Sequence, residues 1–198
     1  MQEAPISINT QSDEDLAALV FEIDPRLEYI KDMHPEGSSC RTLLVKLDGR
    51  RHVLKARAVS NNAWDETYFY YEIHALNRAA ERNLSHVTRL VREYSSDRYH
   101  AVLKSYVEGT PCNKMDSDEL LRDRQFIAKL DALYLKLHLA GIAKILFQPR
   151  KIVIDEAGEL HLVDLSTCIV NTEAGVAEFS QQMRADSRFI TRLERDAA

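Results

Sequence analysis

Residues 137–167 combine a helix end, an irregular basic loop and two short apolar runs. The apolar residues of LYLKLHLAG have helical spacing, and Gly141 marks the end of that helix. KIVID and LHLVDL then predict two short strands around a turn at 156–158. No Asp or Glu occurs between Asp131 and Asp155, so the basic loop contains no carboxylate of its own.

The remaining segments supply further helices and strand pairs, with no internal repeat. An Asp-Gly pair between two apolar runs predicts a hairpin, and apolar residues at helical spacing predict helices. The expected elements are a helix after residue 12, a hairpin across 40–59, a helix across 64–83, two strands around 95–97, a long helix across 116–141 with a kink near its start, the hairpin described above, and one or two polar helices across 173–195. This order lacks regular β-α-β alternation and predicts an α+β fold with a mostly strand half and a mostly helical half.

Charge and composition exclude several classes of protein. The chain of 198 residues has a net charge of −5, which disfavours a general nucleic-acid binder. Its three cysteines are far apart and form no C-x-x-C pair, so zinc and redox-dithiol sites are not indicated. The first residues lack the basic and apolar regions of a signal peptide, and no apolar run approaches the roughly 20 residues that span a bilayer. We therefore expect a cytoplasmic protein with no transmembrane segment and no nucleic-acid partner.

Three charged residues stand where they could serve phosphate chemistry. Lys55 ends an apolar strand in which Leu54 faces the core, so Lys55 can face a cleft. Glu72 lies in the following helix, and a carboxylate that holds an ammonium can aim it at a phosphate. Asp164 follows an apolar strand, where its carboxylate can bind a hard divalent cation. Each also has a plain structural interpretation: a solvated strand lysine, an ordinary helical glutamate and a strand-terminating aspartate.

Histidine, aromatic and serine residues give weaker signals. His138 lies on an apolar helix face and is expected to be packed rather than catalytic. The aromatic cluster YFYYE at 68–72 has helical spacing, which favours a core and its flank over a base-stacking platform. Ser166 lacks the G-x-S-x-G context of a nucleophile elbow.

Four segments occur in an order that resembles a protein-kinase-like domain: VLK at 53–55, VLKSYVEGTPC at 102–112, LHLAGI at 137–142 and LVDLS at 162–166. The resemblance is closest to the small bacterial and atypical kinases of the RIO and lipopolysaccharide-kinase type, and it covers roughly residues 30 to 172. It implies a small N-terminal β-rich lobe and a reduced C-terminal helical lobe, with ATP and Mg²⁺ bound between them. The implied domains are an N-terminal extension with a helix at 1–30, a first lobe at 31–108 and a truncated second lobe at 109–198.

The resemblance also implies roles for individual residues. Lys55 would hold the phosphates, Glu72 would orient Lys55, and Asp164 would bind the magnesium ion. The residues implied to contact the nucleotide are Gly37 in the glycine-rich loop, Lys55, the hinge residues Ser105, Tyr106 and Val107, and the basic residues Lys144 and Lys151.

The catalytic loop departs from the family pattern G-I-x-H-x-D-x-x-x-x-N. On GIAKILFQPRKIVI, the His falls on Lys144, the catalytic Asp on Leu146 and the metal-binding Asn on Lys151. An apolar side chain therefore replaces the general base, and a cation replaces a magnesium ligand. Lys144, Arg150 and Lys151 form a basic loop that either neutralises phosphate charge or is simply solvated.

Three functional hypotheses remain open from the sequence. The first is a divergent kinase-like protein that binds ATP and transfers phosphoryl groups weakly, without the usual catalytic Asp. The second is a catalytically inactive pseudokinase that acts as an interaction or regulatory module, with a protein partner docked on the helical half or the basic loop. The third is an unrelated α+β domain that has the same order of elements by chance.

Overall fold

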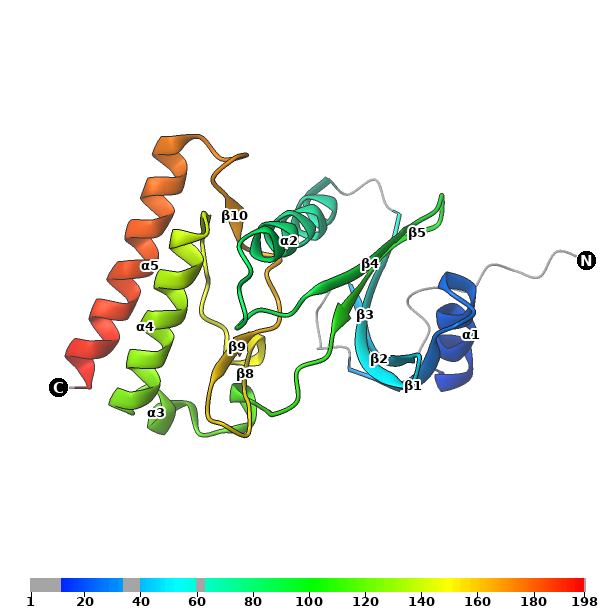
Figure 1. Ribbon diagram of the computed structural model, residues 1–198, viewed down its shortest axis with the longest axis horizontal. Helices are drawn as coiled ribbons and strands as arrows, with labels where there is room; N and C mark the ends of the chain where they lie inside the picture. The colour runs from blue at the N-terminus through cyan, green and yellow to red at the C-terminus, as the bar shows by residue number, and fades with distance from the viewer. Residues whose placement is uncertain (1–11, 34–39, 60–62, 198) are drawn as a thin grey trace, which may run out of the picture. The chain divides into compact units, whose positions relative to one another are not determined.

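The computed structural model describes residues 12–33, 40–59 and 63–197, and it is a mixed α+β structure (Figure 1). This confirms the predicted α+β class, while the kinase-like architecture stays a prediction. The chain forms two units, of which the first comprises the described residues of 1–65 and 90–106, and the second those of 66–89 and 107–198. The lobe boundaries implied by the family resemblance stay predictions.

The first unit contains a 5-stranded antiparallel sheet with the strand order β1-β2-β3-β5-β4. Its strands are β1 (Glu28–Asp32), β2 (Arg41–Leu47), β3 (Arg50–Ala58), β4 (Leu90–Ser95) and β5 (Tyr99–Ser105). Asp48 and Gly49 connect β2 to β3 with φ angles of 51° and 76°. Positive φ at both residues is the geometry that an Asp-Gly hairpin predicts. β1, at one edge of the sheet, was not predicted from the sequence.

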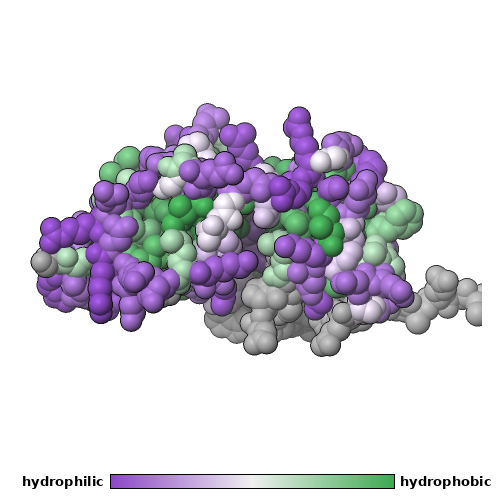
Figure 2. Space-filling model, turned by 90° about the horizontal axis from the view of Figure 1, so that it is seen from below, coloured by the Kyte–Doolittle hydropathy of each residue, from purple (hydrophilic) through white to green (hydrophobic). Residues whose placement is uncertain are grey.

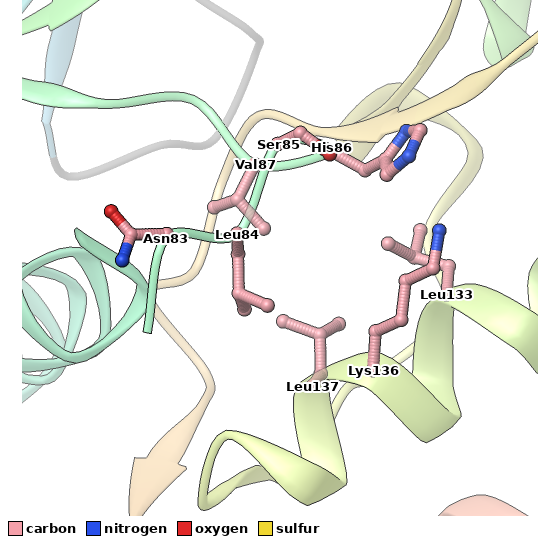
Figure 3. A pocket seen from close by; sticks show the side chains of 8 residues that line it. All are labelled: Asn83, Leu84, Ser85, His86, Val87, Leu133, Lys136 and Leu137. Carbon is pink, nitrogen blue, oxygen red and sulfur yellow. The ribbon is translucent and has the colours of Figure 1, made fainter. Parts of the chain in front are cut away.

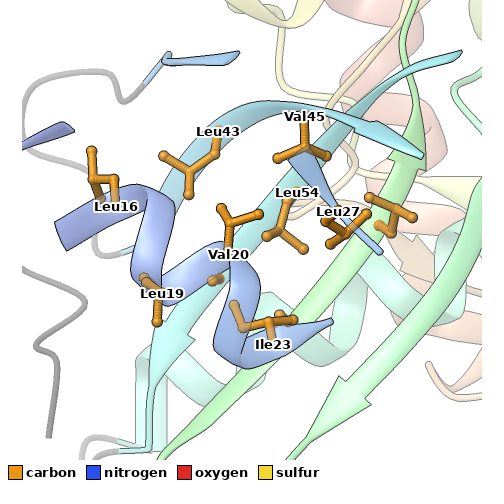
Figure 4. Close-up of a cluster of buried hydrophobic side chains, with 11 residues drawn as sticks. Leu16, Leu19, Val20, Ile23, Leu27, Leu43, Val45 and Leu54 are labelled. Atoms are coloured by element: carbon orange, nitrogen blue, oxygen red, sulfur yellow. The ribbon is translucent and has the colours of Figure 1, made fainter. Parts of the chain in front are cut away.

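Helix α1 (Asp13–Ile23) covers one face of this sheet. The Ser12 hydroxyl accepts a hydrogen bond from the Asp15 backbone N–H at 3.1 Å and so caps the start of the helix. Figure 4 shows buried side chains of α1 packed with Leu27, which precedes β1, and with side chains of the sheet. The sheet residues of this cluster are Leu43, Val45, Leu54, Ala56, Ala101 and Leu103. Because Leu54 belongs to this core, Lys55 lies on the opposite face of β3.

The second unit contains four helices among its described residues and two small sheets. The helices are α2 (Ala63–Glu81), most of which belongs to this unit, α3 (Ser117–Leu120), α4 (Arg124–Leu139) and α5 (Val176–Asp196). β6 (Thr110–Pro111), β8 (Ile152–Ile154) and β9 (Leu160–Leu162) form one sheet in that order, and β7 (Ile142–Ala143) pairs with β10 (Ile169–Val170). The interruption between α3 and α4 is the predicted kink, and the C-terminal segment forms one helix.

α4 and α5 lie side by side in the second unit (Figure 1). The loop after β7 is held between them by aromatic contacts. The ring of Phe147 stacks on Phe189 of α5 at 5.6 Å and meets Phe126 of α4 edge-on at 6.4 Å. These contacts place the predicted catalytic loop against both helices.

Figure 2 shows one face of the molecule, coloured by hydropathy. Hydrophilic side chains cover most of the face shown in Figure 2, with hydrophobic side chains between them. No helix in the described part of the chain combines the length and the apolar character needed to cross a membrane.

Candidate functional site

The β8–β9 hairpin brings Lys151 close to Asp164. Ile152 pairs with Leu162 in this hairpin. One residue further along, the Val163 backbone N–H donates to the Lys151 carbonyl at 2.8 Å. The ladder therefore extends past the strand ends, and it sets Lys151 beside the chain that leads into Asp164.

The side chains of these two residues form an ion pair. Lys151 Nζ lies 3.2 Å from Asp164 Oδ1. The same ammonium donates to the hydroxyls of Ser166 at 3.4 Å and Thr167 at 3.2 Å. The Lys151 side chain is only 6% exposed, whereas that of Asp164 is 28% exposed. The pair is thus partly shielded from water on the lysine side.

Asp164 Oδ1 also organises the turn that follows it. It accepts hydrogen bonds from the Ser166 backbone N–H at 2.9 Å and from the Ser166 hydroxyl at 2.6 Å. An Asp that bonds to the backbone two residues later stabilises a tight turn. One carboxylate oxygen therefore accepts two hydrogen bonds from Ser166 and also pairs with the Lys151 ammonium.

Cys168, just after this turn, lies within a cluster of charged groups. Burial raises the pKa of its thiol, and the carboxylates of Glu72, Asp164 and Asp186 raise it further, while the Lys151 ammonium lowers it. Glu72 itself is fully buried. Of these charged groups, Lys151 and Asp164 are in direct contact. Cys40, Cys112 and Cys168 are all buried, and no disulfide joins them.

The basic loop at 144–151 is anchored through its backbone. The Ile145 N–H donates to both carboxylate oxygens of Asp186, at 3.1 and 3.2 Å. The Tyr134 hydroxyl donates to the Ile145 carbonyl at 2.6 Å. Lys144 adopts a φ of 62°, which is uncommon for a residue other than glycine. Leu146, at the position implied for the catalytic Asp, is 50% exposed.

Asp186 is a residue that the sequence analysis missed. Its carboxylate also lies 2.9 Å from His138 Nε2, and both side chains are less than a tenth exposed. His138 is thus packed, as predicted. A signal for Asp186 was present, because it shares the apolar stripe of α5 with Ile190 and Leu193, four and seven residues later. An unpaired carboxylate on such a stripe would be costly, so its presence indicates a buried partner.

The other predicted nucleotide-contacting residues have different surroundings. Lys55, 6% exposed, lies in β3 between Thr42 of β2 and Val102 of β5. Ser105 ends β5, and the guanidinium of Arg51 lies over the Tyr106 ring at 5.2 Å. These residues belong to the first unit, whereas Val107 and Lys144 belong to the second. Gly37 lies outside the described residues. How Lys55 is related to Glu72 and Asp164 stays a prediction.

A hollow in the second unit lies between α4 and the segment that follows α2 (Figure 3). Its volume is about 180 Å³, smaller than the roughly 300 Å³ or more of typical ligand pockets. Burial lowers the pKa of His86 on its wall, and the nearby Lys136 ammonium lowers it further. None of the residues predicted to bind ATP is among its lining residues. The hollow is therefore distinct from the candidate site.

Comparison with known proteins finds no matching protein-family model and no matching curated protein. Over residues 12–33, 40–59 and 63–197, no three His, Cys, Asp or Glu side chains are grouped so as to hold a metal ion. The Lys151–Asp164 pair and the anchored basic loop make up the candidate site.

Proposed function

We propose that the protein is a kinase-like nucleotide-binding module that does not catalyse phosphoryl transfer, a pseudokinase with a regulatory or interaction role. The contact of 3.2 Å between Lys151 and Asp164 carries this proposal. The family resemblance implies that these two positions share one metal ion, so they should be neighbours. Their proximity supports a kinase-like arrangement, while the lysine argues against the usual metal chemistry.

The loop also lacks a group that could act as general base. Leu146 stands at the implied base position, and its side chain cannot accept a proton. Asp186, the carboxylate that contacts the loop, is engaged by the Ile145 N–H and His138. A general base contributes roughly 10²–10⁴-fold to a rate, and phosphoryl transfer also depends on charge neutralisation by metal ions. The absence of a general base and the lysine at an implied metal-ligand position both support nucleotide binding without phosphoryl transfer.

Nucleotide binding requires positive groups for the phosphates, and the chain supplies them on two segments. In the first unit, Lys55 on β3 is the proposed phosphate-holding lysine, and in the second unit Lys144 and Arg150 supply positive charge on the basic loop. Arg150 is exposed, and Lys144 is partly buried. A flexible, exposed lysine positions a phosphate poorly, so the buried Lys55 is the better candidate for a fixed contact.

Titration of the full chain with a fluorescent ATP analogue tests the proposal. We expect saturable binding that unlabelled ATP displaces, with ATP consumption no faster than in protein-free buffer. Lys55→Ala should weaken binding by about tenfold or more, since it removes a charged phosphate contact. Lys46→Ala is the matched control, because Lys46 is an exposed lysine on the neighbouring strand β2. Absence of binding would refute the proposal, and sustained turnover would favour the weak phosphotransferase.

A further inference from the structure

The family resemblance implies a magnesium ion on Asp164, and the residues present can be tested against that ion. Mg²⁺ binds oxygen ligands at about 2.0–2.1 Å in an octahedral arrangement. Here the implied second ligand position carries Lys151, whose ammonium has no lone pair to offer a metal. Asp164 Oδ1 already accepts two hydrogen bonds from Ser166 and forms an ion pair with the Lys151 ammonium. The donor set does not fit a magnesium ion bridging these positions.

The ammonium itself has the surroundings of a bound cation. Three oxygens lie around Lys151 Nζ: Asp164 Oδ1 at 3.2 Å, Ser166 Oγ at 3.4 Å and Thr167 Oγ1 at 3.2 Å. Three acceptors match the three N–H donors of an ammonium. A lysine that is 6% exposed keeps its charge only if a carboxylate and hydrogen-bond acceptors compensate for its lost hydration. The turn after Asp164 provides all of these groups.

From this geometry we infer that Lys151 is a built-in cation that replaces the divalent metal, so that the site takes metal-free nucleoside phosphates. This inference rests on the proposed function for its ligand class. A divalent ion at Asp164 would lie beside the fixed positive charge of Lys151, and like charges repel at such short range. The lysine carries its charge covalently, so phosphate neutralisation at this position does not depend on the metal concentration.

Metal binding alone gives the first test, with Mn²⁺ as the probe and electron paramagnetic resonance of the full chain as the measurement. The wild type should leave the free Mn²⁺ signal unchanged, whereas Lys151→Asn should reduce it, because an amide oxygen then joins the Asp164 carboxylate. Lys129→Asn is the matched control. Lys129 pairs with Glu159 at 3.4 Å, near the other end of the same hairpin, and its loss should create no site.

Nucleotide binding gives the second test. The wild-type affinity for the fluorescent ATP analogue should be unchanged within about twofold, or tighter, when EDTA replaces Mg²⁺. Lys151→Asn should instead bind about tenfold or more tightly with Mg²⁺ than with EDTA. Lys151→Gln provides a second amide variant if Lys151→Asn fails to fold, as judged by circular dichroism.

The two tests can fail independently, so the role of Lys151 and the proposed nucleotide binding are distinguished. Retention of Mn²⁺ by the wild type, or a loss of about tenfold in its ATP affinity on chelation, would overturn the role of Lys151 and leave nucleotide binding intact. Absence of ATP binding in both buffers would refute the proposed function. The Mn²⁺ measurement would then still decide whether Lys151 excludes a metal.

Discussion

At residue 24, a single carboxylate connects the end of α1 to the sheet of the first unit. The Asp24 oxygens accept hydrogen bonds from Arg26 at 2.9 and 2.6 Å, from Arg92 at 3.2 Å and from the Tyr94 hydroxyl at 2.9 Å. The hydrogen bond from Arg26 is the main cause that lowers the pKa of Asp24 to about 2. Arg92 and Tyr94 lie on β4, so the hydrogen bonds of Asp24 connect the end of α1 to an edge strand of the sheet.

The lowered pKa gives a prediction of how stability depends on pH. A carboxyl whose folded pKa lies below its ordinary value of about 3.9 stabilises the fold above that value, and the contribution is lost as pH falls towards 2. Asp24→Asn should therefore lower the free energy of unfolding by about 2 kcal/mol at neutral pH, as expected for lost hydrogen bonds to a charged group. Its difference from the wild type should shrink between about pH 4 and pH 2.

Urea unfolding at about pH 7, 4 and 2.5 measures this difference. Glu93→Gln, an exposed change on β4, serves as the control and should stay within about 0.5 kcal/mol of the wild type at each pH. A difference for Asp24→Asn that is constant down to the lowest pH would contradict the prediction.

The role of a single residue was predictable from the sequence only where a recognisable pattern included its position. The resemblance to kinase-like domains pointed to the positions of Lys151 and Asp164. Their ion pair depends on the register of the β8–β9 hairpin, and residue types alone do not determine that register. Asp186 left a signal on the apolar stripe of α5. Asp24 left none, because its partners on β4 are distant in the sequence.

At the scale of elements, local chemistry predicted the long helices and both main hairpins. The Ser12 cap and the Asp48-Gly49 turn are decided by neighbouring residues, so their geometry follows from the sequence. β1 was missed because EYIKD has one partly buried residue and no apolar alternation, and its pairing with β2 comes from tertiary structure. β6, β7 and β10 have two residues each, too few to form a pattern.

The pairing of β6 with β8 depends on Gly109, which precedes β6. Its φ is +145°, and a Cβ atom at this position would lie 2.2 Å from the Ile154 carbonyl oxygen. Backbone atoms cannot yield as a flexible side chain can, so Gly109→Ala should destabilise the fold by about 2 kcal/mol or more, through strain and a displaced β6. Chemical denaturation measures this change.

Gly175→Ala is the matched control for that substitution. Gly175, at the start of α5, has a φ of −59°, and a Cβ atom there would meet nothing within 4 Å. Because alanine adopts this φ without strain, the replacement should change stability by no more than about 1 kcal/mol. Equal effects of the two alanine substitutions would rule out the close approach at Gly109 as the cause.

For the molecule as a whole, the sequence predicted the α+β class because the order of strands and helices excludes regular alternation. It did not reveal that β4 and β5 complete a sheet with β1–β3 while residues 66–89 belong to the second unit. Local periodicity identifies an element, but the surface on which the element packs is decided by contacts distant in the sequence.

The net charge of −5 sets the electrostatic background for a triphosphate ligand. Charges separated by more than about 8 Å are largely screened at physiological salt. Binding should therefore depend on the local charge of the basic loop and not on the total. Arg150→Gln, which changes an exposed residue of that loop, should weaken ATP binding by about two- to tenfold.

Arg195→Gln lowers the net charge by the same single unit at a distant position. Arg195 lies six residues after Phe189, which contacts the basic loop, and this separation corresponds to roughly 9 Å at 1.5 Å per residue. Its replacement should leave ATP affinity unchanged within about twofold, because salt screens a charge at that distance. Titrations of both variants at about 0.15 M salt measure the comparison. Equal weakening by the two substitutions would mean that long-range charge, and not the basic loop, governs phosphate binding.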